Sequence, residues 1–248
     1  MPAPATERLL RDGPAVAGVS WAQTTRHGGA SAPPYGGFNL APHVGEPPAT
    51  TAANWQHLAA VGSIAREDIA TCRQVHGARI LPVTSGGHDD TEADALVSVT
   101  PGLGVGVYTA DCVPVLFAAP GRGVAAAHCG WRGAALGLAG ETLMVLAKAA
   151  RVAPREVDIW LAPSIAQDSY EVGPELRERF AAEHLRPRAG GKFELDVSGA
   201  VVADLLRRGA DPTRVRVSAV DTFGDGACYS YRREGTPSGR MLSYVRLV

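Results

Sequence analysis

The sequence of 248 residues predicts a single α/β (α+β) domain, a compact layered sandwich with mixed β-sheets and flanking helices. Hydrophobic residues make up 46% of the chain, which is enough for a sizeable core in a chain of this length. Short apolar runs typical of strands alternate with helical patterns. Because no linker, repeat or low-complexity segment divides the chain, we expect residues 17–248 to form one domain. Residues 1–16 are expected to form a loosely ordered arm.

The first third of the chain is predicted to be mostly loop, with one helix. Residues 24–48 are dense in Gly and Pro but also carry Arg, His, Asn and Tyr, and a long loop of this kind is usually functional. Residues 50–62 show a helical pattern, followed by extended structure within residues 70–83. The apolar face of the helix is expected to contain Trp55, Leu58 and Val61.

The remaining elements follow in order along the chain. Apolar or alternating runs predict strands at residues 94–99, 102–111, 113–119, 123–130, 157–163, 214–220 and 241–248. Helical patterns predict helices at residues 133–150, 174–185 and 196–208. Pro174 suits a first helical turn. Asp196 or Ser198 can begin the last helix, and Gly209 follows its end.

Composition excludes several classes of protein. The net charge of −1 leaves no broad basic field for a nucleic acid backbone. Four cysteines without a CxxC spacing do not make a disulfide scaffold. There is no signal-peptide pattern and no run of 18 apolar residues. We therefore expect a cytoplasmic protein with reduced thiols that binds neither nucleic acid nor membrane.

The stretch AAHCGWRG places two potential ligands, His128 and Cys129, side by side. The preceding loop, residues 119–121, predicts a hairpin whose paired residue numbers add up to 240. Cys112 then lies opposite His128, with Cβ atoms about 4.5–5.5 Å apart. In a regular strand, Cys129 and Asp111 point to the other face. The predicted pair is therefore Cys112 with His128, provided that the register does not slip by one residue.

Further candidates lie on either side of this hairpin. His76 in QVHG is the best third ligand, because it lies in a segment predicted to be extended, next to a glycine. Cys72, four residues earlier, is expected to be a core residue. After His128, the sequence GWRG leads into a predicted helix whose free N–H groups, together with Arg132, suit an anion. Trp131 either packs there or stacks on a base.

Several motifs occur together in one known family. The sequence contains, in order, TTRHGGAS, FNLAPHVG, QVHG, PGLGVGVYTADCVPV, AAHCGWRG, SYEVG and YSYRREG followed by SGR. In these motifs it resembles the laccase-domain family, long described as multicopper polyphenol oxidases and associated with purine nucleoside phosphorylase and adenosine deaminase activities. The resemblance implies one zinc ion on His76, Cys112 and His128, with Arg26 near the substrate or phosphate. It also implies a compact layered α/β sandwich.

The sequence departs from the family pattern at three positions. The family often has alanine where Cys129 stands, which favours a spectator role for this thiol. Ser164 replaces a common cysteine, and Asp221 precedes Thr222 where the family has Cys-Thr. All three metal positions are intact.

Three protein ligands leave one zinc position open, which is the catalytic pattern, and zinc lowers the pKa of bound water toward 7. Together with this chemistry, the family resemblance implies phosphorolysis of adenosine, inosine and methylthioadenosine, and deamination of adenosine. The partners expected are a purine nucleoside and phosphate, bound by a monomer or small homo-oligomer. The residues expected to bind them are Arg26, Asn39, His43 and Arg132, with His43 as a candidate for the general acid.

Three alternatives stay open. Cys112 can instead be the nucleophile of a cysteine hydrolase acting on a peptidoglycan precursor, with His76 or His128 as base. The site can also take up copper and oxidise polyphenols, because copper binds more tightly than zinc in general. Seven histidines and no His-x-His pair argue against a true multicopper oxidase. A metal-stabilised binding module is the third alternative, although a structural zinc ion normally has four protein ligands.

Overall fold

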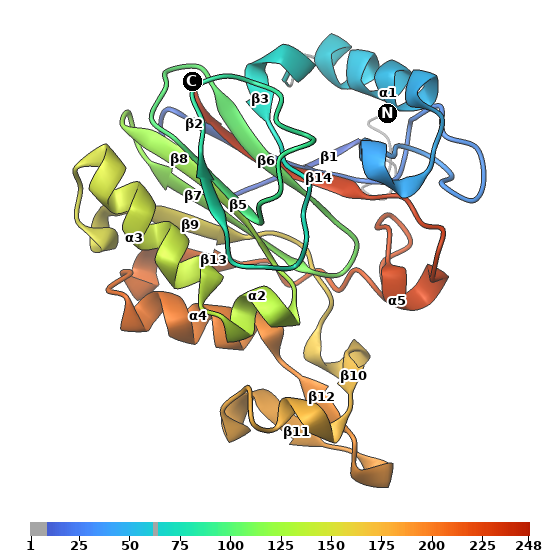
Figure 1. Ribbon diagram of the computed structural model, residues 1–248, viewed down its shortest axis with the longest axis vertical. Coiled ribbons are helices and arrows are strands. Elements are labelled where there is room, and N and C mark those ends of the chain that lie inside the picture. Colours follow the sequence, from blue (N-terminus) through green and yellow to red (C-terminus); the bar gives the residue numbers. More distant parts are fainter. Residues whose placement is uncertain (1–8, 62–63) are drawn as a thin grey trace.

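Two large β-sheets stack face to face in the computed structural model, which describes residues 9–61 and 64–248 (Figure 1). The five-stranded sheet has, in order, β1 (Leu10–Asp12), β2 (Val19–Thr24), β14 (Met241–Leu247), β6 (Gly104–Thr109) and β3 (Ile69–Ala70). The six-stranded sheet has β13 (Val215–Val217), β9 (Asp158–Leu161), β7 (Val113–Ala119), β8 (Gly123–Cys129), β5 (Ala95–Ser98) and β4 (Ile80–Pro82). Each sheet mixes parallel and antiparallel pairs.

The inner faces of the two sheets share one hydrophobic core. Val105 and Val107 of β6 pack with Leu116 of β7 and Val124 of β8 in this core. Every residue of β7 and β8 is buried, because helices cover the other face of their sheet. This double burial explains why both strands are continuous apolar runs rather than alternating ones.

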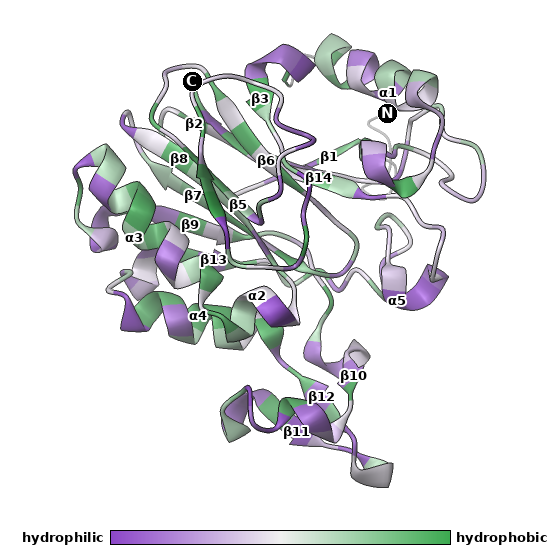
Figure 2. Ribbon diagram, in the orientation of Figure 1, coloured by the Kyte–Doolittle hydropathy of each residue, from purple (hydrophilic) through white to green (hydrophobic). Residues whose placement is uncertain are grey.

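Helices cover the two outer faces. Three lie beside the six-stranded sheet: α2 (Trp131–Ala135), α3 (Leu138–Ala150) and α4 (Val197–Arg207). On the other side, α1 (Pro48–Ala60) packs Trp55 and Leu58 against Tyr244 of β14. A short helix, α5 (Tyr231–Glu234), precedes β14. Figure 2 shows hydrophobic residues along the central strands, and both hydrophobic and hydrophilic residues along the outer helices. The predicted layered sandwich with mixed sheets and flanking helices is therefore confirmed.

A third, small sheet projects from the body (Figure 1). It contains β10 (Glu171–Val172), β12 (Phe193–Leu195) and β11 (Leu185–Pro187). The helix predicted at residues 174–185 is wrong, because only short 3-10 turns occur there. Leu185 pairs with Leu195 across the strands, so tertiary pairing outweighs local helix propensity.

Other elements differ from the prediction at their ends. The helix expected at residues 133–150 is broken into α2 and α3, because Gly137 adopts a left-handed conformation with φ of 71°. Val61 is half exposed rather than part of the apolar face of α1. Residues 10–12, placed in the loose arm, form β1 and pair with β2. The prediction for residues 1–8 lies outside the described residues, as does the end of the first helix at Gly62.

The last predicted helix is observed where it was expected, as α4. The Asp196 side chain accepts a hydrogen bond from the backbone N–H of Gly199, and Gly209 follows the helix with φ of 89°. Among the described residues, no helix is both long and apolar enough to cross a membrane.

Candidate active site

Three potential metal ligands meet at one end of the six-stranded sheet. His128 is the second-last residue of β8, Cys112 lies directly before β7, and His76 lies in the loop between β3 and β4. Their ligand atoms all lie within 4.8 Å of one another. The two imidazole rings are 4.8 Å apart at their centroids and nearly perpendicular. The structure thus brings together all three residues that the sequence placed in the metal site.

The hairpin that carries two of these residues has a register different from the predicted one. Val113 pairs with Cys129 and Ala119 with Gly123, so paired residue numbers add up to 242. The turn contains residues 120–122 instead of 119–121, which shifts the register by two residues. A shift of two preserves the face of every side chain, because side chains alternate along a strand. The predicted direct pairing of Cys112 with His128 is therefore wrong, but their predicted common face is correct.

Gly130 explains how the sulfur of Cys112 fits beside the histidines. A Cβ atom at Gly130 would lie 2.9 Å from Cys112 Sγ and 3.3 Å from His76 Cδ2. The missing side chain at Gly130 therefore leaves the room in which the three ligands converge.

The neighbours of the ligands point in different directions. Cys129 is fully buried in the core beneath α3, on the face opposite His128, as strand alternation predicts. Burial raises the pKa of the Cys129 thiol far above its usual value. Asp111 was expected to face away from the site, provided that the strand was regular there. Instead β7 begins only at Val113, Asp111 has φ of 89°, and it lines the cavity.

A buried carboxylate, Asp94, orients both histidines. It lies 3.0 Å from His128 Nδ1 and accepts hydrogen bonds from the backbone N–H groups of His76 and Gly77, at 2.9 and 2.7 Å. The sequence predicted an extended conformation for His76, but its backbone is left-handed with φ of 59°. The hydrogen bonds to Asp94 stabilise the tight bend there. Burial would raise the pKa of Asp94, but these hydrogen bonds and the charge of His128 lower it overall. The arrangement leaves Nε2 of His128 for the ligand cluster.

Cys112 and His128 form a strongly coupled pair. Burial by itself would raise the pKa of the Cys112 thiol, but the charge of His128 and hydrogen bonds from His128 and His76 lower it to about 6. Burial would lower the pKa of His128, but Cys112 and Asp94 raise it to about 9. Without a metal ion, each group of the pair therefore favours the charged form of the other.

The donor set fits zinc. One thiolate sulfur and two imidazole nitrogens are its usual ligands, and a tetrahedral zinc ion with bonds of about 2.0–2.3 Å keeps its ligand atoms within about 4 Å of one another. The separation of up to 4.8 Å needs only a small inward movement. A carboxylate that holds the second nitrogen of a ligating histidine, as Asp94 does for His128, is also typical of zinc sites.

A cavity of about 480 Å³ opens over the cluster. This volume is in the range of sites for small ligands. Its wall contains the aromatic side chains His43, Tyr108, Trp131, Tyr170 and Tyr231, the polar side chains Gln74 and Asp111, and the arginines Arg132, Arg232 and Arg240. Flat aromatic surfaces combined with positive charge suit a ligand that has both a ring system and an anionic group.

Two of the four predicted substrate residues line this cavity. His43 packs edge-on against Tyr108, with ring centroids 5.7 Å apart. Burial is the main cause of its lowered pKa, and Arg240 adds to it. Arg132 lies at the cavity rim with its guanidinium 4.3 Å from the ring centroid of Trp131.

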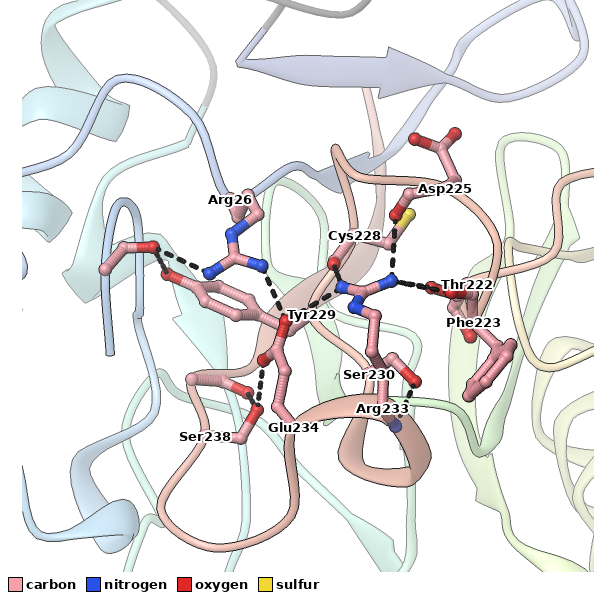
Figure 3. Close-up of polar contacts among 12 residues, drawn as sticks. Arg26, Thr222, Phe223, Asp225, Cys228, Tyr229, Ser230, Arg233, Glu234 and Ser238 are labelled. Carbon is pink, nitrogen blue, oxygen red and sulfur yellow. Dashed lines mark hydrogen bonds and ion pairs between the residues drawn. The ribbon is translucent and has the colours of Figure 1, made fainter. Parts of the chain in front are cut away.

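The other two predicted residues do not line the cavity. Arg26 donates a 2.5 Å hydrogen bond to Glu234 and stacks on Tyr229 (Figure 3). Asn39 is completely buried, donates to Glu46 and accepts from the backbone N–H of Arg240. Their contacts support the loops around the cavity, and direct binding of substrate by either residue stays a prediction.

The C-terminal loop provides cavity residues that sequence reasoning missed. Asp111 accepts hydrogen bonds from the side chains of Thr222 and Ser230 and from the backbone N–H of Arg232. Arg233 donates to the backbone carbonyls of Thr222, Phe223, Asp225 and Cys228 (Figure 3). These bonds hold Tyr231 and Arg232 at the cavity. The motif YSYRREG followed by SGR was visible in the sequence, but its spacing alone gives no role to these residues.

Comparison with known proteins identifies the family. The family model described as "Multi-copper polyphenol oxidoreductase laccase" matches residues 20–248. The chain belongs to this laccase family. A relative named "Purine nucleoside phosphorylase YfiH" from Escherichia coli is 36% identical over 95% of this chain and 96% of its own length. A "Purine nucleoside phosphorylase" from Deinococcus radiodurans is 35% identical over 92% of this chain and 89% of its own length.

Two solved structures share the fold. YlmD from Geobacillus stearothermophilus superposes with a TM-score of 0.87 at 30% identity, covering 93% of this chain and 92% of that one. The protein NMB0706 from Neisseria meningitidis gives 0.83 at 32% identity, covering 97% and 99%. The resemblance drawn from the sequence motifs is thereby confirmed.

Proposed function

We propose that this protein is a zinc-dependent purine nucleoside phosphorylase. The observation that carries the proposal is the convergence of His76, Cys112 and His128 beneath a cavity walled by aromatic and arginine side chains. The names of the relatives from Escherichia coli and Deinococcus radiodurans support the substrate class. The protein thus takes a purine nucleoside and inorganic phosphate.

The chain's own residues bind and orient the reactants. The rings of Tyr170, Tyr231 and Trp131 offer flat surfaces for a purine. The lowered pKa of His43 keeps its imidazole neutral at pH 7, so it donates a hydrogen bond to the base without adding charge. When bound, zinc supplies a Lewis acid and lowers the pKa of a water molecule.

The proposed reaction exchanges one bond for another at the ribose. An oxygen of hydrogen phosphate forms a bond to C1′ while the bond between C1′ and N9 breaks and its electron pair goes to the purine. The phosphate loses one proton and the purine gains one, so the products are ribose 1-phosphate and the free base. The cavity's arginines stabilise the negative charge of the attacking group.

Adenosine deamination is the second candidate, and one observation favours it. Among the described residues, the metal cluster contains His76, Cys112 and His128 without a fourth His, Cys, Asp or Glu ligand. An open ligand position is typical of catalytic zinc sites that use water. In this reaction the oxygen of water replaces the amino group at C6 of adenine, and ammonia leaves.

A cysteine hydrolase is the third candidate, because His128 lowers the pKa of the Cys112 thiol and Cys112 raises the pKa of His128, which favours a thiolate beside an imidazolium when no metal is bound. Metal content separates this candidate from the first two. A free nucleophile is incompatible with stoichiometric, tightly held zinc on the same sulfur.

Metal analysis of the purified protein, combined with product analysis on adenosine, inosine and methylthioadenosine, tests the proposal. We expect about one zinc ion per chain, and a free base that appears only when phosphate is present. Inosine formed from adenosine without phosphate would demonstrate deamination.

A pair of cysteine variants sharpens this experiment. We expect Cys112→Ala to lose zinc and nucleoside turnover, because it removes one of three ligands. Cys129→Ala is the matched control: it changes the same residue type next to a ligand, but its side chain points into the core. Full zinc content and full turnover in Cys112→Ala would overturn the proposal.

A further inference from the structure

Arg240 is a cavity residue that forms no ion pair with any carboxylate of the described residues. Its Nη1 donates hydrogen bonds to the backbone carbonyls of Ser238 and Gly239, at 2.8 and 2.9 Å. No carboxylate oxygen of the described residues lies within 4.0 Å of its guanidinium. The two nearby arginines Arg26 and Arg233 differ, because both pair with Glu234.

The backbone fixes Arg240 against the cavity. Its N–H donates to the side chain of the buried Asn39, at 2.9 Å, and the bonds from Nη1 hold one edge of the guanidinium. Nε and Nη2 have no hydrogen-bond partner among the described residues, and the side chain lines the cavity over the metal ligands. The free edge of the guanidinium can therefore bind a ligand in the planar, two-pronged manner that suits oxyanions.

Burial makes this free charge costly. Burial is the largest influence on the pKa of Arg240 and lowers it, although Cys112 and Asp111 act in the opposite direction. A partly desolvated cation without a carboxylate partner is stabilised by an anion that enters the cavity. Metal binding would increase this demand, because zinc neutralises the thiolate of Cys112.

Two further arginines extend the positive charge toward the cavity mouth. Arg232 stacks on Tyr170 and donates to the backbone carbonyl of Glu171, and exposed Arg132 stacks on Trp131. Neither has a carboxylate partner within 4.0 Å among the described residues. Their charges attract an anion to the cavity, where Arg240 is the most firmly held of the three.

We propose that Arg240 binds the attacking oxyanion, inorganic phosphate, and that Asn39 positions Arg240 for this task. This assignment rests on the proposed phosphorolysis. It differs from the expectation that Arg26 holds the phosphate: Arg26 pairs with Glu234 and does not line the cavity. Phosphate bound at Arg240 shares the cavity with the nucleoside and the metal ligands.

Binding of inorganic phosphate to the zinc-loaded protein, measured by calorimetry without nucleoside, tests the assignment independently of turnover. We expect Arg240→Ala to weaken phosphate binding by about 10- to 100-fold, because it removes charge-assisted hydrogen bonds. Arg240→Lys should restore part of the affinity, since it keeps the charge but loses the planar fork. The matched control is Arg122→Ala, an exposed arginine in the turn between β7 and β8, which should bind phosphate like the unchanged protein.

Steady-state kinetics separate the two proposals. If the protein is a phosphorylase, Arg240→Ala should raise KM for phosphate by about the same factor and leave KM for the nucleoside within about twofold. Unchanged phosphate affinity in a zinc-loaded, folded Arg240→Ala would overturn the assignment even if phosphorolysis is observed. Phosphate binding that depends on Arg240 in a protein without phosphorolysis would support the anion site and overturn the proposed function.

Discussion

Cys112 differs from the other three cysteines in its surroundings. Burial raises the pKa of Cys72 and Cys228 to about 12, and it raises that of Cys129 further still. Burial acts in the same direction on Cys112, but the neighbouring histidines outweigh it and lower the pKa to about 6. Since the thiolate is the reactive form, one thiol of four should be reactive at neutral pH.

Alkylation with iodoacetamide tests this difference. In the metal-free protein we expect modification of Cys112 alone at pH 7, detected by mass spectrometry of its peptide. The rate should rise as the pH passes about 6 and then level off, because ionisation is complete above the pKa. Added zinc should suppress the reaction. Equal labelling of all four cysteines, or labelling that begins only above about pH 8, would contradict the assignment.

At the scale of elements, the residue before the start of β5 fixes the positions of the His76 loop and of His128 on β8. Asp94, directly before β5, accepts hydrogen bonds from the His76 loop and binds Nδ1 of His128 on β8. We expect Asp94→Asn to weaken zinc binding by about 10- to 100-fold, as is typical when the partner of a ligating histidine is lost. Competition with a chelator measures this affinity. The control is Asp90→Asn, an exposed carboxylate nearby. Equal zinc affinity in the two variants would refute the orienting role of Asp94.

The hairpin shows how far sequence reasoning reaches at this scale. Alternation correctly placed Cys112 and His128 on one face, because the face depends only on whether the register shift is even. The pairing itself depended on which three residues form the hairpin turn. The sequence APGR allows a turn at residues 119–121 or at residues 120–122. Asp94 and Arg240 were missed, because their roles depend on contacts between distant parts of the chain: Arg240 is held by Asn39, 201 positions away.

At the scale of the whole molecule, burial on both faces made the central strands predictable. Continuous apolar runs identified β7 and β8, and the capping pattern identified α4. The region of the small third sheet was predicted as a helix, because its polar sequence carries helix propensity while its structure depends on pairing with β12. Prediction succeeded where burial determines the hydrophobic pattern of the sequence, and it failed where the structure is determined by pairing with a distant strand.

The ion pair of Arg26 with Glu234 connects the loop after β2 to α5, 208 positions away. Burial would raise the pKa of Glu234, but hydrogen bonds from Arg233 and Ser238 and the charges of Arg26 and Arg233 lower it overall. A lowered folded-state pKa means that this carboxylate stabilises the fold above its unfolded pKa of about 4.3, and that the contribution is lost as the pH falls through the folded-state value.

The variant Glu234→Gln should therefore reduce the free energy of unfolding at pH 7 by about 1–3 kcal/mol, because it removes charge-assisted hydrogen bonds. The loss relative to the unchanged protein should shrink below about pH 4, where the carboxylate of the unchanged protein begins to take up a proton. Denaturant unfolding at a series of pH values measures both effects. Glu178→Gln, at an exposed position, is the control and should follow the unchanged protein. If the free energy of unfolding of Glu234→Gln differed from that of the unchanged protein by the same amount at every pH, the charge of Glu234 would not contribute to the stability of the contact with Arg26.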